Sequence, residues 1–171
     1  MLHKTTHQLN NEVAQLHLAK WLEEGVAEYF STSRIRDGKL MVGQIDPQTY
    51  PVWWIDDIAT ATNVQACVAN GSVIPLRAII TNTGGPSMNT HFNLYYLHWW
   101  TLTHFLFENP KFRDSSLMLL EHGGSLDDFE KDIGPVDSVT SGWFRHVATI
   151  KTAVAGNDKD FITSGQLPSD D

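Results

Sequence analysis

One segment constrains the fold more than any other: the run from Phe92 to Glu108, which is rich in aromatic and aliphatic residues. A segment of this length and apolar density predicts a largely buried helix rather than a surface helix with one apolar stripe. The helix should end before Asn109-Pro110, because a residue that precedes proline disfavours helical geometry. A buried helix of this length favours a mainly α-helical chain.

The remaining segments predict more helices and at most a minor sheet. Asp37-Gly38 lies between two short apolar runs, which indicates a small β-hairpin within residues 34–45. Gly123-Gly124 is a natural helix end, and Ser125 suits the cap of the next helix. Helices are expected over residues 1–18, 18–30, 55–68, 75–80, 112–121, 126–133 and 143–154.

Length and composition indicate one acidic, soluble domain. The chain has 171 residues, of which 42% are hydrophobic and 19% charged, so we expect a single domain over residues 1–155 and a polar tail over 156–171. The single cysteine, Cys67, excludes an intrachain disulfide and a cysteine-rich zinc module. A net charge of −8 argues against nucleic acid as a partner. The chain shows neither a signal peptide nor a transmembrane segment, and its compartment stays unknown.

Two histidines and a carboxylate form the strongest chemical pattern. His3 and His7 are four residues apart, which places both imidazoles on one helix face where they can share a metal ion. The following segment, WLEEGVAEYF, places a carboxylate, from Glu23, Glu24 or Glu28, on a second helix. Two histidines and one carboxylate leave a coordination position open for water. The alternative is that the histidines lie in a frayed terminus and that the glutamates form a solvated helix face.

The motif HKTTHQL followed by WLEEGVAEYF resembles the gluzincin zinc metallopeptidases. It is most similar to the bacterial peptidase-MA-like group, which has an H-E-x-x-H-Q helix and a W-L-x-E-G-x-A-E-Y-F helix. The resemblance implies hydrolysis of peptides by a zinc-activated water, with His3, His7 and Glu24 as the Zn²⁺ ligands. A later stretch, YLHWWTLTHFL, is similar to a further family helix. Through it Tyr96 would match a tyrosine that stabilises an oxyanion, although a core aromatic is the simpler interpretation.

Lys4 departs from this family pattern at the position of the general base. The family has a glutamate there, and an ammonium cannot accept the proton of a zinc-bound water. Lys4 also adds a positive charge beside the metal site, so we expect weakened zinc binding and impaired hydrolysis. One hypothesis is that Lys4 replaces the metal by pairing with Glu23 or Glu24.

The second departure is that the chain begins at the motif. The family carries strands before this helix, so we expect the helical C-terminal part of a zincin-like fold without its N-terminal sheet. The surface left by those strands would favour a homodimer. Two alternatives are a non-catalytic module that binds a peptide or protein partner, and a truncated fragment of a larger peptidase. The other histidines receive no chemical role, and His98 and His104 are expected in the core or at its rim.

Overall fold

The computed structural model describes residues 2–8 and 17–156. This part of the chain is mainly helical and contains one two-stranded sheet, as the sequence predicts. In chain order the elements are α1 (Leu2–Gln8), α2 (Lys20–Ser31), β1 (Arg34–Arg36), β2 (Lys39–Met41), the 3₁₀ helix η2 (Val52–Asp57), α3 (Val64–Ala69), α4 (Leu76–Thr81), α5 (Met88–Glu108), α6 (Arg113–His122), α7 (Leu126–Asp132) and α8 (Val136–Ala155).

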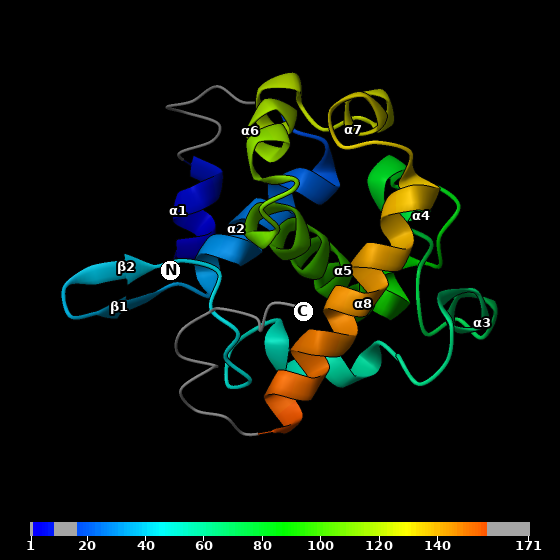
Figure 1. Cartoon of the computed structure of the whole chain (residues 1–171), viewed down its shortest axis with the longest axis horizontal. Helices are drawn as coiled ribbons and strands as arrows, with labels where there is room; N and C mark the ends of the chain where they lie inside the picture. Colours follow the sequence, from blue (N-terminus) through cyan, green and yellow to red (C-terminus); the bar gives the residue numbers. More distant parts are fainter. Residues whose placement is uncertain (1, 9–16, 157–171) are drawn as a thin grey trace.

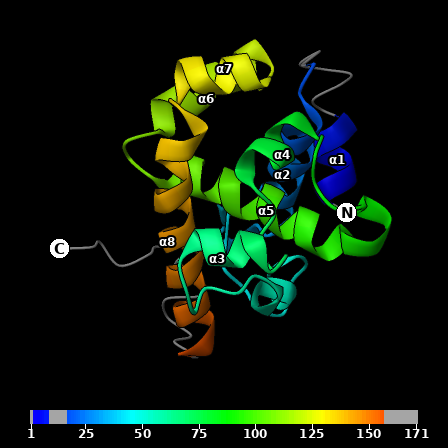
Figure 2. The same ribbon diagram turned by 90° about the vertical axis from the view of Figure 1, so that its right-hand side faces the viewer.

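Helix α5 runs through the middle of the molecule (Figure 1). It contacts α2, η2, α4, α6 and α8, and Figure 2 shows α2 and α8 on opposite sides of it. Nearly every residue from Leu94 to Leu106 is buried, which confirms the predicted buried helix. The helix ends at Glu108, before Asn109-Pro110, as expected.

Helices α2 and α5 approach each other closely at Gly25. A β-carbon added at Gly25 would lie 2.2 Å from Oγ1 of Thr103 and 2.7 Å from the carbonyl oxygen of Trp99. Any larger residue would therefore push α2 away from the central helix. Because Glu24 precedes Gly25 in the chain, this contact also fixes where the Glu24 side chain begins.

The hairpin formed by β1 and β2 follows α2 and projects from the helical body (Figure 1). Its turn residues Asp37 and Gly38 have φ angles of 50° and 74°, as a tight hairpin turn of this kind requires. This confirms the predicted hairpin. At its base, Arg34 donates a hydrogen bond of 2.8 Å to the carboxylate of Asp46.

Three predicted helices were wrong in extent. The helix expected over residues 1–18 ends at Gln8 in its described part; residues 9–16 lie outside the described chain, and residues 17–19 are not helical. Ala19 instead donates its backbone N–H to the carbonyl of Gly123. The helix expected over 55–68 is two elements, η2 and α3, because the Asn63 side chain caps a new helix. Helix α8 begins at Val136, seven residues before the predicted start, directly after Pro135.

Three histidines lie within the helical core or at its edge, and all have neutral partners. His98 donates from Nδ1 to the Leu94 carbonyl at 2.7 Å and accepts from the Ile74 N–H at 3.1 Å. His104 donates from Nε2 to the Gly43 carbonyl at 3.0 Å, and its Nδ1 accepts from His146 at 2.9 Å. Full burial of His98 and His104 confirms their predicted place in the core.

Burial lowers the pKa of both His98 and His104 to about 4, so both are neutral at physiological pH. The domain prediction ends at the last residue of α8, and the predicted tail over 156–171 lies outside the described chain apart from Gly156. None of the described helices is both long and apolar enough to cross a membrane.

Candidate metal centre

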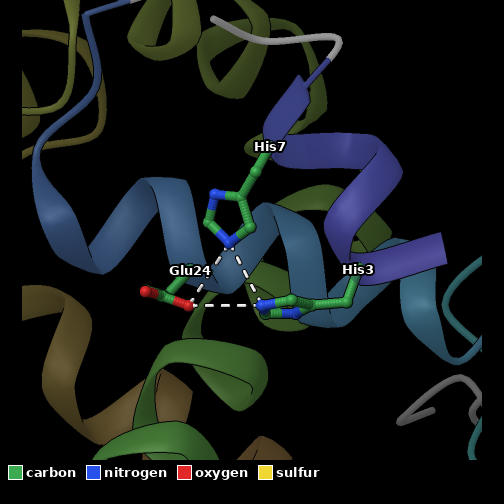
Figure 3. A group of neighbouring side chains, drawn as sticks. All are labelled: His3, His7 and Glu24. Carbon is green, nitrogen blue, oxygen red and sulfur yellow. Dashed lines mark hydrogen bonds and ion pairs between the residues drawn. The ribbon is translucent and has the colours of Figure 1, made fainter. Parts of the chain in front are cut away.

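Helices α1 and α2 pack together and bring the three predicted metal ligands to one point (Figure 3). His3 and His7 point from α1 toward Glu24 on α2. The spacing of four residues on α1 places the two imidazoles one turn apart in an edge-to-face arrangement, with ring centroids 4.7 Å apart. The sequence thus identified three residues that the fold does bring together.

The three ligand atoms form a triangle of suitable size for a metal ion. Nε2 of His3 and Nε2 of His7 are 3.1 Å apart, and they lie 3.7 and 3.5 Å from Oε2 of Glu24. A triangle with these sides has a circumscribed radius of about 2.0 Å, which matches the usual length of zinc–nitrogen and zinc–oxygen bonds. Two imidazoles and one carboxylate are also the donor set of many catalytic zinc sites, so the residues fit this ion.

A second layer of carboxylates holds the outer nitrogens of both imidazoles. His7 donates from Nδ1 to Glu23 at 2.9 Å. Nδ1 of His3 lies 3.1 Å from Oε1 of Glu28, an ion-pair distance, although the angles of a hydrogen bond are not met. Carboxylates in these positions favour the tautomer with a proton on Nδ1, which directs the lone pair of each Nε2 toward the other two ligand atoms.

The site has an excess of lone pairs at its centre. With protons on both Nδ1 atoms, two Nε2 lone pairs would face each other at 3.1 Å unless a proton or a cation lies between them. Oε2 of Glu24 is buried there and accepts no hydrogen bond. A buried carboxylate oxygen without a donor is costly and calls for a positive charge.

The charges around His3 also favour a positive charge at this site. The contact with the Glu28 carboxylate is the main cause that raises the pKa of His3, and the negative charge of Glu24 adds to it. Burial opposes both effects. Glu28 itself is only 1% exposed, so the alternative in which the α2 glutamates form a solvated face is wrong for this residue.

Lys4 takes no part in the ion pairs of this cluster. Its side chain is exposed, and it has no ion-pair partner among residues 2–8 and 17–156. The hypothesis that Lys4 pairs with Glu23 or Glu24 is therefore wrong for this structure. The physical reason is that the imidazoles of His3 and His7 already contact both carboxylates.

A cavity of about 420 Å³ borders the cluster. Tyr96, the predicted oxyanion residue, lies in its wall beside Tyr50, and their ring centroids are 5.5 Å apart. Burial raises the pKa of both tyrosines, and the charges of Glu24 and Glu28 raise it further. Both phenols thus keep their protons and can donate hydrogen bonds to a bound group. The cavity is lined by His3, Glu28, Ser31, Thr49, Tyr50 and Tyr96.

Three residues of this region were missed as site residues: Glu23, Glu28 and Tyr50. A signal for Glu28 was present, because Glu24 and Glu28 are four residues apart on α2 just as His3 and His7 are on α1. Two matched spacings on adjacent helices predict two contacts one turn apart. Tyr50 lies in a segment without periodicity, where no local pattern indicates its neighbours.

The chain matches no protein-family model, no curated protein and no solved structure.

Proposed function

We propose that this chain is a gluzincin-like metallopeptidase domain that binds zinc through His3, His7 and Glu24, and that hydrolyses peptides poorly. One observation carries the proposal: three ligand atoms from two helices converge on a point about 2.0 Å from each. The outer carboxylates Glu23 and Glu28 support it, because protein zinc sites orient their histidines in this way.

The expected chemistry divides between the metal and the chain. Bound zinc would supply an acidified water able to attack a peptide carbonyl at neutral pH. The residues hold the site's geometry, and the phenols of Tyr50 and Tyr96 face the cavity as donors for a polarised carbonyl oxygen.

Proton transfer is the weak step in this proposal. Lys4 cannot accept a proton while it is charged. Glu28 is no substitute, because one of its oxygens contacts His3 and the other accepts a hydrogen bond of 3.1 Å from Ser31. In this proposal, neither Lys4 nor Glu28 is suited to activating the water, which is why hydrolysis is expected to be poor.

Metal analysis of the purified, zinc-loaded protein tests the site. We expect about one zinc ion per wild-type chain, lost in Glu24→Gln because an amide is a poor zinc ligand. Glu130→Gln is the matched control, since Glu130 is an exposed glutamate that pairs with Arg77 far along the chain. A wild-type protein that stays folded and takes up no zinc would contradict the proposal.

Replacing Lys4 tests the missing base. We expect Lys4→Glu to gain hydrolysis of a mixed peptide library by about 100-fold or more, within the range that general-base catalysis contributes. Lys131→Glu reverses an exposed charge on α7 and should gain nothing. Ordinary peptidase activity in the wild type would refute the role assigned to Lys4.

A second candidate function is a peptide-binding module that does not cut. The observation that favours it is the cavity beside a site in which the carboxylates of Glu23 and Glu28 already contact the histidines. It predicts that peptides bind with equal affinity with and without zinc and that Lys4→Glu stays inactive. Calorimetric titration of the same library distinguishes this outcome from the first.

A further inference from the structure

The hairpin of β1 and β2 has properties that the metal centre does not explain. Residues 34–41 carry three cations, Arg34, Arg36 and Lys39, against one anion, Asp37, within a chain of net charge −8. Ile35 is 79% exposed and Leu40 is 59% exposed. The hairpin thus combines a positive charge with two large apolar side chains in water.

The register of β1 and β2 places the apolar and the charged side chains on opposite faces of the hairpin. Ile35 pairs with Leu40 across the two strands, so both apolar side chains stand on one face. Arg36 pairs with Lys39 on the opposite face, where two like charges lie directly across from each other. Like charges in that relation destabilise a strand pair, and neither has an ion-pair partner among the described residues.

Both edges of this sheet are open within the described chain, because the sheet contains only β1 and β2. Two strands of three residues are too short to be stable alone in water, and a third strand would normally complete such a unit. Figure 1 shows the hairpin projecting beyond α1 and α2, so a third strand would meet little obstruction.

We propose that the hairpin is a docking surface for an extended acidic segment of a partner protein, which adds a strand to its edge. Side chains of the added strand alternate between the two faces of the sheet, and each face of the hairpin favours a different kind of residue. An apolar residue of the partner falls on the face of Ile35 and Leu40, and an acidic residue next to it falls on the face of Arg36 and Lys39. The acidic group relieves the repulsion between the two cations.

A second copy of this chain fits less well. Two such hairpins edge to edge would bring four unpaired cations together, which adds to the repulsion already present within each hairpin. Charge complementarity therefore favours an acidic partner over self-association, and this preference does not depend on zinc.

Fluorescence anisotropy with short labelled peptides tests the proposal on the full chain. We expect a peptide that alternates Glu and Val to bind the wild type, and one that alternates Lys and Val not to bind. The double variant Arg36→Glu, Lys39→Glu should weaken the first peptide by about tenfold or more and accept the second. Lys111→Glu with Lys131→Glu is the control, since it removes two exposed cations from other elements.

A second readout locates the contact. Binding of the Glu–Val peptide should shift the backbone amide resonances of residues 34–41 and should fall in Ile35→Ser with Leu40→Ser, whose side chains are too exposed to support the core. Absence of binding, equal binding of both peptides, or a dimer of the wild type that the Ile35 and Leu40 changes dissociate would each overturn the proposal.

Discussion

Two pairs of histidines in this protein have opposite surroundings. His98 and His104 lie in or against the central helix α5, and their partners are backbone groups or, for His104, a second imidazole. His3 and His7 lie near the surface between α1 and α2, and every partner of their rings is a carboxylate or the other ring. Burial lowers the pKa in the first region, whereas a carboxylate contact raises the pKa of His3 in the second.

This difference teaches that the partners of a histidine, rather than its burial, indicate its chemistry. The core rings have each donor matched to an acceptor, so they need nothing more. The rings of the α1–α2 cluster leave lone pairs and a buried carboxylate oxygen pointing at one another. The α1–α2 cluster lacks a positive charge at its centre, and it is therefore the region that can bind a cation.

The strongest test of the comparison removes a ligand from the cluster. We expect His7→Ala to lower zinc affinity by more than about 100-fold, since losing a ligand costs more than losing an outer partner. His17→Ala removes an exposed histidine outside the cluster and should leave the affinity unchanged. Competition titration with a chromophoric chelator measures both. Equal affinities would mean that zinc binds elsewhere.

The next test removes a core ring. His104→Ala leaves the Gly43 carbonyl and the His146 ring without a partner and opens a cavity, so the free energy of unfolding should fall by about 3 kcal/mol. The same measurement on metal-free His7→Ala should show a change below about 1 kcal/mol. Urea denaturation followed by tryptophan fluorescence gives both values, and similar losses would erase the distinction between the two regions.

A smaller effect is expected for the outer carboxylates. Glu28→Gln should weaken zinc binding by about tenfold, because it removes the charge that makes His3 a stronger ligand. Glu23→Gln should have a smaller effect, since the Glu23 side chain is 31% exposed against 2% for Glu28 and its charge is screened by water. The same chelator titration tests this order, and the reverse order would contradict it.

The free energy of unfolding should depend on pH because His98 and His104 are buried in the core. In the unfolded chain a histidine takes up a proton near pH 6.5, but folded His98 and His104 do so only near pH 4. Each therefore lowers the free energy of unfolding as pH falls through this window, by about 1.4 kcal/mol per pH unit, and has no effect above it. His104→Gln should flatten this slope relative to wild type in urea melts between pH 7 and 4, whereas His91→Gln should not.

Much of the fold could be predicted because its signals are local. Apolar density marked α5, Asp37-Gly38 marked the hairpin, and Ser125 with Asp128 forms the capping box that begins α7. The first helix was predicted to reach residue 18, but residues 17–19 are not helical and Ala19 bonds to Gly123. The segment around residue 60 was predicted as one helix but forms two, because Asn63 caps the second.

The candidate site was predictable only where spacing carries information. His3 and His7 follow from their four-residue spacing, and Glu24 follows from the resemblance. The partnership of His104 with His146 spans 42 positions, and the place of Tyr50 beside Tyr96 depends on how η2 and its preceding loop pack on α5. No periodicity encodes such contacts, because tertiary packing creates them.

Gly25 has a consequence for how such chains diverge. It is required by the crossing of α2 on α5, whereas its neighbour Glu24 is required only if a cation is bound. Related chains that bind no cation would be free to replace the glutamate, but they would have to keep the glycine to keep this helix crossing. Among related sequences, the glycine would therefore indicate a shared fold, and the residue before it would indicate whether the cation site is present.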